Sequence, residues 1–141
     1  MTKREIIKII VEAFNKGNKL LIFGCGGSMA EASHMAAEFI GIGLPAIALN
    51  DPAVITALAN DYTFNMVFSK QIFALGKKGD IAIALSTSGK SRSVIYGINK
   101  AKAMGLTVID WPRNRGKTTG TIQEYQLKLI HEVFLTVNKN L

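Results

Sequence analysis

The sequence predicts a doubly wound α/β domain in which about four parallel strands form the middle of three layers. Two observations support this prediction. Short, almost wholly apolar runs alternate with longer amphipathic segments, which is the pattern of a parallel sheet covered by helices on both faces. Two of these runs end in Gly/Ser-rich turns directly before a helix, where such sheets bind ligands. The 141 residues, 48% of them apolar, suit a single domain over 1–141 with a flavodoxin-like strand order.

The elements of the amino-terminal half follow from apolar spacing and from glycine stops. Isoleucines at helical spacing predict a helix over 3–16, within an amino-terminal segment 1–17 that ends at Gly17. The apolar run over 20–23 predicts a strand that enters a glycine turn. The next expected elements are a helix over 28–40, a strand over 45–49, a helix from 51 or 52 to about 58, and a helix over 64–75.

The carboxyl-terminal half repeats the alternation. The run DIAIAL over 80–85 predicts a third strand, and a helix over 91–104 is closed by Gly105. The fourth strand is expected over 106–111, and residues 113–120 are polar and turn-rich. The last element is an amphipathic helix over 121–141. Part of its expected apolar stripe is Ile122, Tyr125, Leu129, Val133 and Val137.

The net charge of +7 first suggests a nucleic-acid ligand. However, the basic residues are scattered, and they form no aromatic-interleaved stripe of the kind that single-strand binders use. A small anionic substrate accounts for the same charge by electrostatic attraction. No apolar run reaches the roughly 18 residues of a membrane span, and no signal-peptide pattern is present. The single cysteine, Cys25, fits a reducing compartment, so we expect a cytoplasmic protein that binds neither membranes nor nucleic acid.

Two loops carry groups that bind an anion. The first, GCGGS over 24–28, offers glycine backbone that a ligand can approach and the free N–H groups of a helix start. The second, STSGKS over 86–91, places four hydroxyls and an ammonium group in six residues. Either loop alone is equally typical of a plain strand-to-helix turn, but the pair favours a phosphate site. Nucleotide motifs do not fit, because Met29 replaces the last glycine of G-x-G-x-x-G and Ala84 the first glycine of a P-loop.

Four stretches of the sequence occur together: GCGGSMAEASHMAAEFIG, LPAIALND, ALANDYTFNMVFSKQIFALGKKGDIAIALSTSGKS and TIQEYQLKLIHEV. They cover most of the chain from Leu20 onward. In this order they resemble the SIS (sugar isomerase) domain family, and most closely its phosphoheptose isomerase branch. The resemblance implies an SIS-type fold and the interconversion of a ketose 7-phosphate, sedoheptulose 7-phosphate, with an aldose 7-phosphate, a heptose 7-phosphate.

The resemblance also implies residue roles, which we carry over position by position. Glu38 matches the family's catalytic base and His131 its catalytic acid. Contacts to phosphate or sugar are implied for Gly26, Gly27, Ser28, Asp61, Ser86, Thr87, Ser88, Ser91 and Gln123. Some members of the family bind zinc, and the matching ligand positions here are His34, Glu38, Gln123 and His131.

Helical spacing tests part of this set independently. His34 and Glu38 are four residues apart and share a helix face, although without the loops such a pair is more often a surface pair. Gln123 and His131 are eight apart, roughly 12 Å along a helix. We therefore expect that these two act through an oligomer interface or that Gln123 is peripheral, and His131 alone could equally be a core-edge histidine. Apolar surface on the first and last helices suggests a homodimer or homotetramer through helices.

The chain departs from the family pattern at several places. Cys25 stands where the first loop usually has asparagine. A strand and an aspartate normally precede the last helix, but here the connection is short and Gly120 occupies the aspartate's place. The loop after Glu38 and the segment before the first strand are also shorter. Within the short connection, the basic side chains of Arg113, Arg115 and Lys117 either contact a phosphate or form a solvated loop.

The sequence leaves three functions to compare. The main prediction is a phosphosugar isomerase that transfers protons through an enediol. The alternative is a non-catalytic SIS protein, either a sugar-phosphate sensor or a partner-binding scaffold like the replication-initiator-associating proteins. Those proteins share the histidine–glutamate and glutamine–histidine pairs, so these pairs do not separate the two functions. A general nucleotide or nucleic-acid binder fits worst, because the motifs do not match and the charge is scattered.

Overall fold

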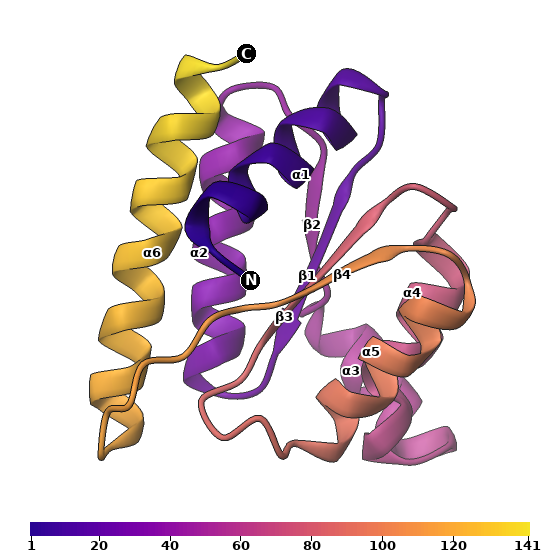
Figure 1. The fold of residues 1–141 in the computed structure, drawn as a ribbon. Coiled ribbons are helices and arrows are strands. Elements are labelled where there is room, and N and C mark those ends of the chain that lie inside the picture. Colours follow the sequence, from indigo (N-terminus) through magenta and orange to yellow (C-terminus); the bar gives the residue numbers. More distant parts are fainter.

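The chain folds into a four-stranded parallel sheet between two layers of helices (Figure 1). The computed structural model describes all residues from Met1 to Leu141. The elements are α1 (Lys3–Asn15), β1 (Leu20–Gly24), α2 (Gly27–Gly41), β2 (Ala46–Ala48), α3 (Pro52–Asp61), the 3-10 helix η1 (Phe64–Met66), α4 (Val67–Leu75), β3 (Ile81–Leu85), α5 (Arg92–Ala103), β4 (Thr107–Asp110) and α6 (Thr119–Lys139). No helix combines the length and the apolar character needed to cross a bilayer.

The strand order is β2-β1-β3-β4, and every neighbouring pair is parallel. This is the predicted flavodoxin-like order, and the predicted doubly wound fold is confirmed. The order reverses between β1 and β3, because the chain leaves β1 toward one edge of the sheet and returns to build the other from β3. Ligands of such sheets bind at this switch point, beyond the carboxyl ends of the strands.

Most differences from the predicted elements are shifts of element ends. Helix α3 continues to Asp61, past the predicted end near 58, and the predicted helix over 64–75 begins as the 3-10 turn η1. Helix α6 begins at Thr119 rather than 121, because Thr118 caps it by accepting a hydrogen bond from the N–H of Thr121 at 3.1 Å. Its apolar stripe was also predicted incorrectly at one position, because Tyr125 is 37% exposed and Gln126 is fully buried.

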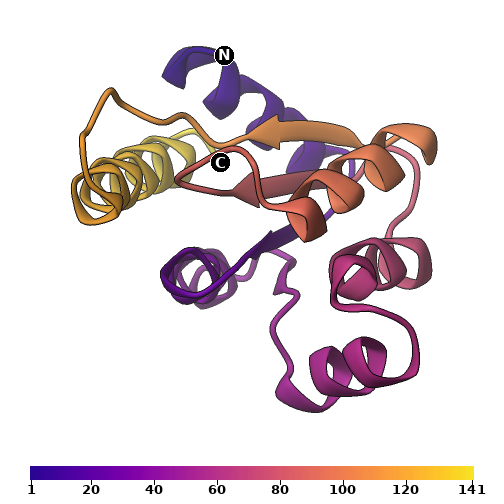
Figure 2. The same cartoon turned by 90° about the horizontal axis from the view of Figure 1, so that it is seen from below.

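Helices cover both faces of the sheet (Figure 2). Each face carries its own apolar core. One core joins the sheet to α1, α2 and α6, and Phe39 of α2 packs against Phe14 and Phe134 with ring centroids 5.6 and 5.5 Å apart. The other core joins the sheet to α4 and α5. There, a Cβ at Gly97 would lie 2.8 Å from the ring of Phe23, so glycine permits the close approach of α5. The first core fixes α2 beside α6, and the seam between these helices carries part of the candidate site.

Asp80 joins the amino ends of β1 and β3. The residue is 2% exposed, and its carboxylate accepts hydrogen bonds from the backbone N–H groups of Lys19 at 3.1 Å and Lys77 at 2.9 Å. It also pairs with the Lys19 ammonium group and accepts a bond from Asn18 at 3.2 Å. Burial alone raises the pKa of the Asp80 carboxyl, but the bonds from Lys19, Lys77 and Asn18 outweigh burial and hold the pKa below its ordinary value.

We expect Asp80→Asn to lower the free energy of unfolding at pH 7 by about 1–3 kcal/mol, because it removes a buried charged acceptor. The folded-state pKa lies below the unfolded one, so this stability is present at neutral pH and is lost as the pH falls through the folded-state value. Denaturant unfolding of both proteins at pH 7 and below pH 4 measures the difference. The difference in the free energy of unfolding between the two proteins should be smaller below pH 4 than at pH 7. An unchanged difference would contradict the role assigned to Asp80.

Candidate functional site

The two predicted anion-binding loops lie side by side. They follow β1 and β3, which pair in parallel with Gly24 opposite Leu85, so both strands end at the same edge of the sheet. Side chains also connect them, because the Cys25 Sγ lies 3.3 Å from the Ser93 Oγ and 3.7 Å from the Ser91 Oγ. The structure therefore brings the hydroxyl-rich second loop against the glycine-rich first loop.

The first loop depends on its glycines. Gly26 has φ +60° and ψ −124°, a conformation that residues with a Cβ rarely adopt. Gly24 has no room for a side chain, because a Cβ there would lie 2.6 Å from the Leu85 carbonyl oxygen. The backbone N–H groups of Gly26 and Gly27 donate to no group of the protein, and Ser28 is buried at the start of α2. The loop thus presents N–H donors at a positive helix end.

The second loop presents donors of two kinds. The hydroxyl oxygens of Ser86 and Ser88 accept bonds from the N–H groups of Gly89 and Lys90, both at 3.0 Å, which leaves their O–H groups free to donate. The N–H groups of Thr87 and Ser88 have no partner in the protein. Ser91 stands at the N-cap of α5 without a side-chain cap bond. Hydroxyl, N–H and helix-end donors are therefore available to one anion.

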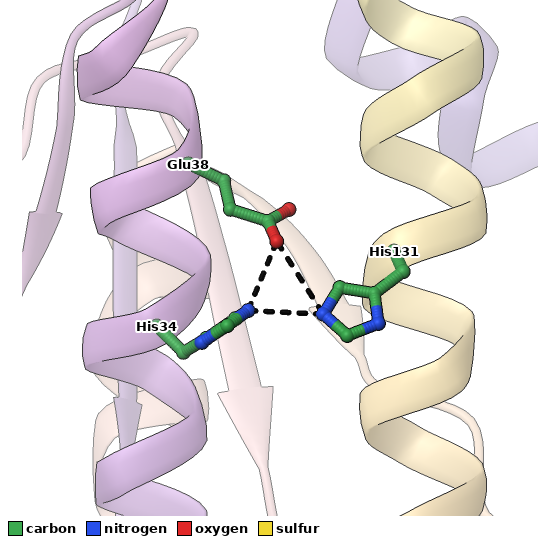
Figure 3. Close-up of side chains that lie close together, drawn as sticks. All are labelled: His34, Glu38 and His131. Atoms are coloured by element: carbon green, nitrogen blue, oxygen red, sulfur yellow. Dashed lines mark hydrogen bonds and ion pairs between the residues drawn. The ribbon is translucent and has the colours of Figure 1, made fainter.

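A cluster of three side chains lies in the seam between α2 and α6 (Figure 3). The Nε2 of His34 lies 2.9 Å from the Oε1 of Glu38, and the Nε2 of His131 lies 3.4 Å from the same oxygen. The two Nε2 atoms are 3.0 Å apart. His34 and Glu38 come from successive turns of α2 and His131 from α6, and both histidine side chains are 47% exposed. The structure thus brings together both predicted catalytic residues and three of the four predicted metal ligands.

Hydrogen bonding alone does not satisfy this cluster. Each imidazole nitrogen carries at most one proton, so three mutual contacts among two nitrogens and one oxygen cannot all be good hydrogen bonds. The other oxygen of Glu38, Oε2, is buried and has no partner. In tetrahedral sites with bonds of ~2.0–2.2 Å, neighbouring ligand atoms are roughly 3.3 Å apart, close to the separations of these three atoms. Two imidazoles and a carboxylate also suit Zn²⁺ chemically, so the cluster fits this metal.

The other predicted site residues lie apart from this cluster. The amide of Gln123 lies against the first loop, because a Cβ at Gly27 would be 2.3 Å from its Nε2. Asp61 is exposed at the end of α3, where its Oδ1 accepts a bond from Asn60 at 3.2 Å, and α3 packs against η1 and α4. Gly120, in the first turn of α6, is exposed.

Sequence reasoning did not single out Glu31, which lies on α2 between Ser28 and His34. One of its carboxylate oxygens, Oε2, is buried without a partner. This burial raises the pKa of Glu31 to about 7, and the nearby His34 opposes the shift only in part. The signal in the sequence is an acidic residue one turn before His34, on a helix whose other first-turn residues are small or apolar.

Comparison with known proteins identifies the family. The family model of the SIS domain matches residues 4–110, which include both loops and the His34–Glu38 pair. The chain belongs to the SIS domain family. The phosphoheptose isomerase of Thermodesulfovibrio yellowstonii is 51% identical over 121 residues, which are 81% of this chain and 60% of the relative. That of Synechocystis is 41% identical over 158 positions, covering 96% of this chain and 81% of the relative.

Solved structures agree with this grouping. The phosphoheptose isomerase GmhA of Neisseria gonorrhoeae superposes with a TM-score of 0.93 at 33% identity, over 97% of this chain and 85% of that one. The phosphoheptose isomerase of Francisella tularensis gives the same TM-score at 28% identity, over 97% and 84%. The predicted resemblance to the phosphoheptose isomerase branch is therefore confirmed.

The SIS chain described here is shorter than these relatives. It spans 60% of the length of the Thermodesulfovibrio protein. Its alignment with the Synechocystis protein extends over 158 positions although the chain has 141 residues, so that relative carries internal residues which this chain lacks. A shortened connection between β4 and α6 is consistent with this difference.

We expect Glu31→Gln to stabilise the metal-free protein above pH 7, by about 1 kcal/mol after allowance for solvent screening. A raised folded-state pKa means that the folded protein holds a proton that the unfolded chain releases between about pH 4.5 and 7, so stability falls as the pH rises through this range. Unfolding with a chelator present at pH 4 and pH 8 checks this. The variant should match the wild type at pH 4, and equal stability at pH 8 would contradict the burial argument.

Proposed function

We propose that this chain is an aldose–ketose isomerase that interconverts sedoheptulose 7-phosphate and a heptose 7-phosphate, acting as one SIS unit. The observation that carries the proposal is that a single helix, α2, begins at the anion-binding loops and carries His34 and Glu38 opposite His131. One rigid element therefore holds the phosphate anchor and the proton-transfer groups at a fixed separation. The named relatives, all phosphoheptose isomerases, support the same substrate class.

The separation suits a long substrate. Ser28 and His34 are six residues apart, which is roughly 9 Å along the helix axis. Side chains of a helix lean toward its amino terminus, so the Glu38 carboxylate reaches back to the level of His34, as their 2.9 Å contact shows. An open-chain seven-carbon sugar with its phosphate at the loops places its carbonyl end near this cluster, whereas a three-carbon substrate does not reach it.

Glu38 and His131 supply the two groups that isomerisation requires. The Glu38 carboxylate removes a proton from the hydroxymethyl carbon beside the ketone, while protonated His131 gives a proton to the ketone oxygen. This forms an enediol. His131 then takes the proton of the neighbouring hydroxyl, and Glu38 returns its proton to the former ketone carbon. The product is the aldehyde, and no atom is gained or lost.

We also propose that the cluster of His34, Glu38 and His131 holds zinc. The buried, unpartnered Oε2 of Glu38 and the convergence of three ligand atoms support this. Gln123, the fourth ligand expected from the family, lies beside Gly27 in this structure. Bound zinc would supply a Lewis acid that polarises the sugar's carbonyl oxygen. His131 and Glu38 belong to both proposals, so activity with and without the metal distinguishes a proton-transfer role from a ligand role.

A cytoplasmic homo-oligomer joined through helices is the assembly that we propose. Helix α3 is largely apolar but has no buried residue, and Ile40 of α2 and Leu135 of α6 are each 57% exposed. Apolar helix surface of this kind is typical of subunit interfaces. The single free cysteine, Cys25, fits a reducing compartment.

One observation favours the alternative of a non-catalytic sugar-phosphate sensor. The connection before α6 is short, and the exposed Gly120 offers no side chain where the family pattern has an aspartate. The N–H and hydroxyl donors of the two loops belong to residues 24–28 and 86–91, outside this segment. A protein that retains the loops but lacks part of the sugar-binding wall would bind the phosphate without turning the sugar over.

We expect Glu38→Gln to reduce the isomerisation of sedoheptulose 7-phosphate by at least about 10²–10⁴-fold, because the amide cannot accept the proton. Phosphate binding should be retained, since the loops are untouched. The assay measures aldose formation with and without added zinc, and Glu124→Gln, which changes an exposed carboxylate of α6 in the same way, is the control. Wild-type turnover by Glu38→Gln would show that the assignment is wrong, and tight sugar-phosphate binding without turnover by the wild type would favour the sensor.

Zinc binding should require the seam between α2 and α6. After chelator treatment, we expect the protein to bind one zinc ion, with a rise in its thermal midpoint. His34→Ala or His131→Ala should weaken binding by more than the roughly 10–100-fold typical of losing a residue that only orients a ligand. Calorimetric titration measures this, with Glu132→Gln as the control beside His131. Equal zinc affinity in all four proteins would exclude the site.

A further inference from the structure

We propose that Arg113 is a positioning residue of the phosphate site, held in place by Asp110. Its guanidinium fixes the second loop, residues 86–91, in the conformation that presents N–H groups to an anion. This inference deepens the proposed function and rests on it for the sugar, but not for the phosphate. Arg113 lies in the shortened connection between β4 and α6, outside the segments that resemble the family.

Arg113 is held rigidly. Its Nη1 and Nη2 atoms donate to the two carboxylate oxygens of Asp110, each at 3.0 Å. Such bidentate pairs fix the plane of the guanidinium as well as its distance. Asp110 is the last residue of β4, which pairs with β3, so the strand that carries the second loop also sets the position of Arg113. The arginine side chain is 29% exposed, less than its partner at 49%.

The guanidinium acts on the peptide between Ser86 and Thr87. The Ser86 carbonyl accepts one bond from Arg113 Nη1 at 3.2 Å and another from the buried amide of Gln126 at 3.3 Å. In a trans peptide the C=O and the following N–H point in opposite directions. Holding the carbonyl toward Arg113 and Gln126 therefore turns the Thr87 N–H to the opposite side, where it has no partner in the protein. A carbonyl facing that side instead would repel an anion.

Arg113 also contacts the other end of the turn. A Cβ at Gly89 would lie 3.1 Å from the guanidinium carbon and from Nη2, so the guanidinium packs against this glycine. Gly89 has φ +69°, and its N–H donates to the Ser86 hydroxyl. The arginine thus spans the turn from Ser86 to Gly89. Gln126 is itself fixed, because the buried Trp111 donates from Nε1 to its backbone carbonyl at 3.2 Å.

Position and charge predict opposite effects for one substitution. If Arg113 acted only through its positive charge, removing the negative charge of Asp110 would strengthen anion binding. If Arg113 acts through position, Asp110→Asn weakens anion binding, because the amide cannot hold both guanidinium nitrogens. Arg115 provides a matched control, since it carries the same charge in the same connection and is exposed.

The experiment measures inorganic phosphate binding, by the shift in thermal midpoint and by calorimetry, for the wild type, Arg113→Ala, Arg113→Lys, Asp110→Asn and Arg115→Ala. We expect Arg113→Ala to weaken phosphate binding about 10-fold or more, the loss typical of a charge-assisted hydrogen bond. Arg113→Lys should recover only part of the affinity, and Asp110→Asn should weaken binding. Arg115→Ala should match the wild type. With sedoheptulose 7-phosphate, Arg113→Ala should raise KM and leave kcat within about 3-fold, since the seam cluster is not touched.

Four results would overturn the inference: tighter phosphate binding by Asp110→Asn, equal effects of the two alanine variants, a change in kcat without one in KM, or a wild type that does not bind phosphate. Circular dichroism without phosphate checks folding, and Arg113→Lys carries the test if Arg113→Ala does not fold. A different result would contradict the proposed function. A wild type that binds phosphate through Arg113 but does not isomerise the sugar supports this inference and contradicts the isomerase.

Discussion

The parallel pairing of β1 with β3 is the constraint on which the candidate site depends. Its register runs from Leu20 opposite Ile81 to Gly24 opposite Leu85, so the two loops begin side by side. Asp80 joins both strands at their other ends. A slip of one residue would turn every strand side chain to the other face, and both apolar cores prevent it. The relative position of the two loops is therefore a product of sheet register rather than of loop sequence alone.

Helix α2 fixes the position of His34 and Glu38 relative to the loops. It starts at the first loop, and its apolar face is fixed by Phe39, which contacts both α1 and α6. His34 and Glu38 consequently have a set height above the loops, and His131 meets them because α6 packs on the same core. The two loops and the three seam side chains belong to one packed unit. Under the proposed function, this arrangement favours a substrate of one length.

The fold, the strand order and both loops could be predicted from the sequence, because they depend on local periodicity and on glycine and hydroxyl composition. Spacing also placed His34 and Glu38 on one face of a helix. It could not tell that His131 lies opposite them while Gln123 lies beside Gly27, because spacing gives a residue's face on its own helix and not the neighbour that this face meets. Spacing also could not tell that Gln126 is buried in place of Tyr125, or that Arg113 contacts the second loop. Both depend on the segments after β3 and β4 lying side by side against α6.

Trp111 is the only tryptophan of the chain, and it is fully buried. Its indole is bonded to the backbone of Gln126, whose side chain holds the Ser86 carbonyl. Two hydrogen bonds, through Gln126, thus link the indole to the Ser86 carbonyl of the second loop. The fluorescence of the indole offers an intrinsic optical signal for events at that loop, and the protein can be studied by rapid mixing without an attached dye.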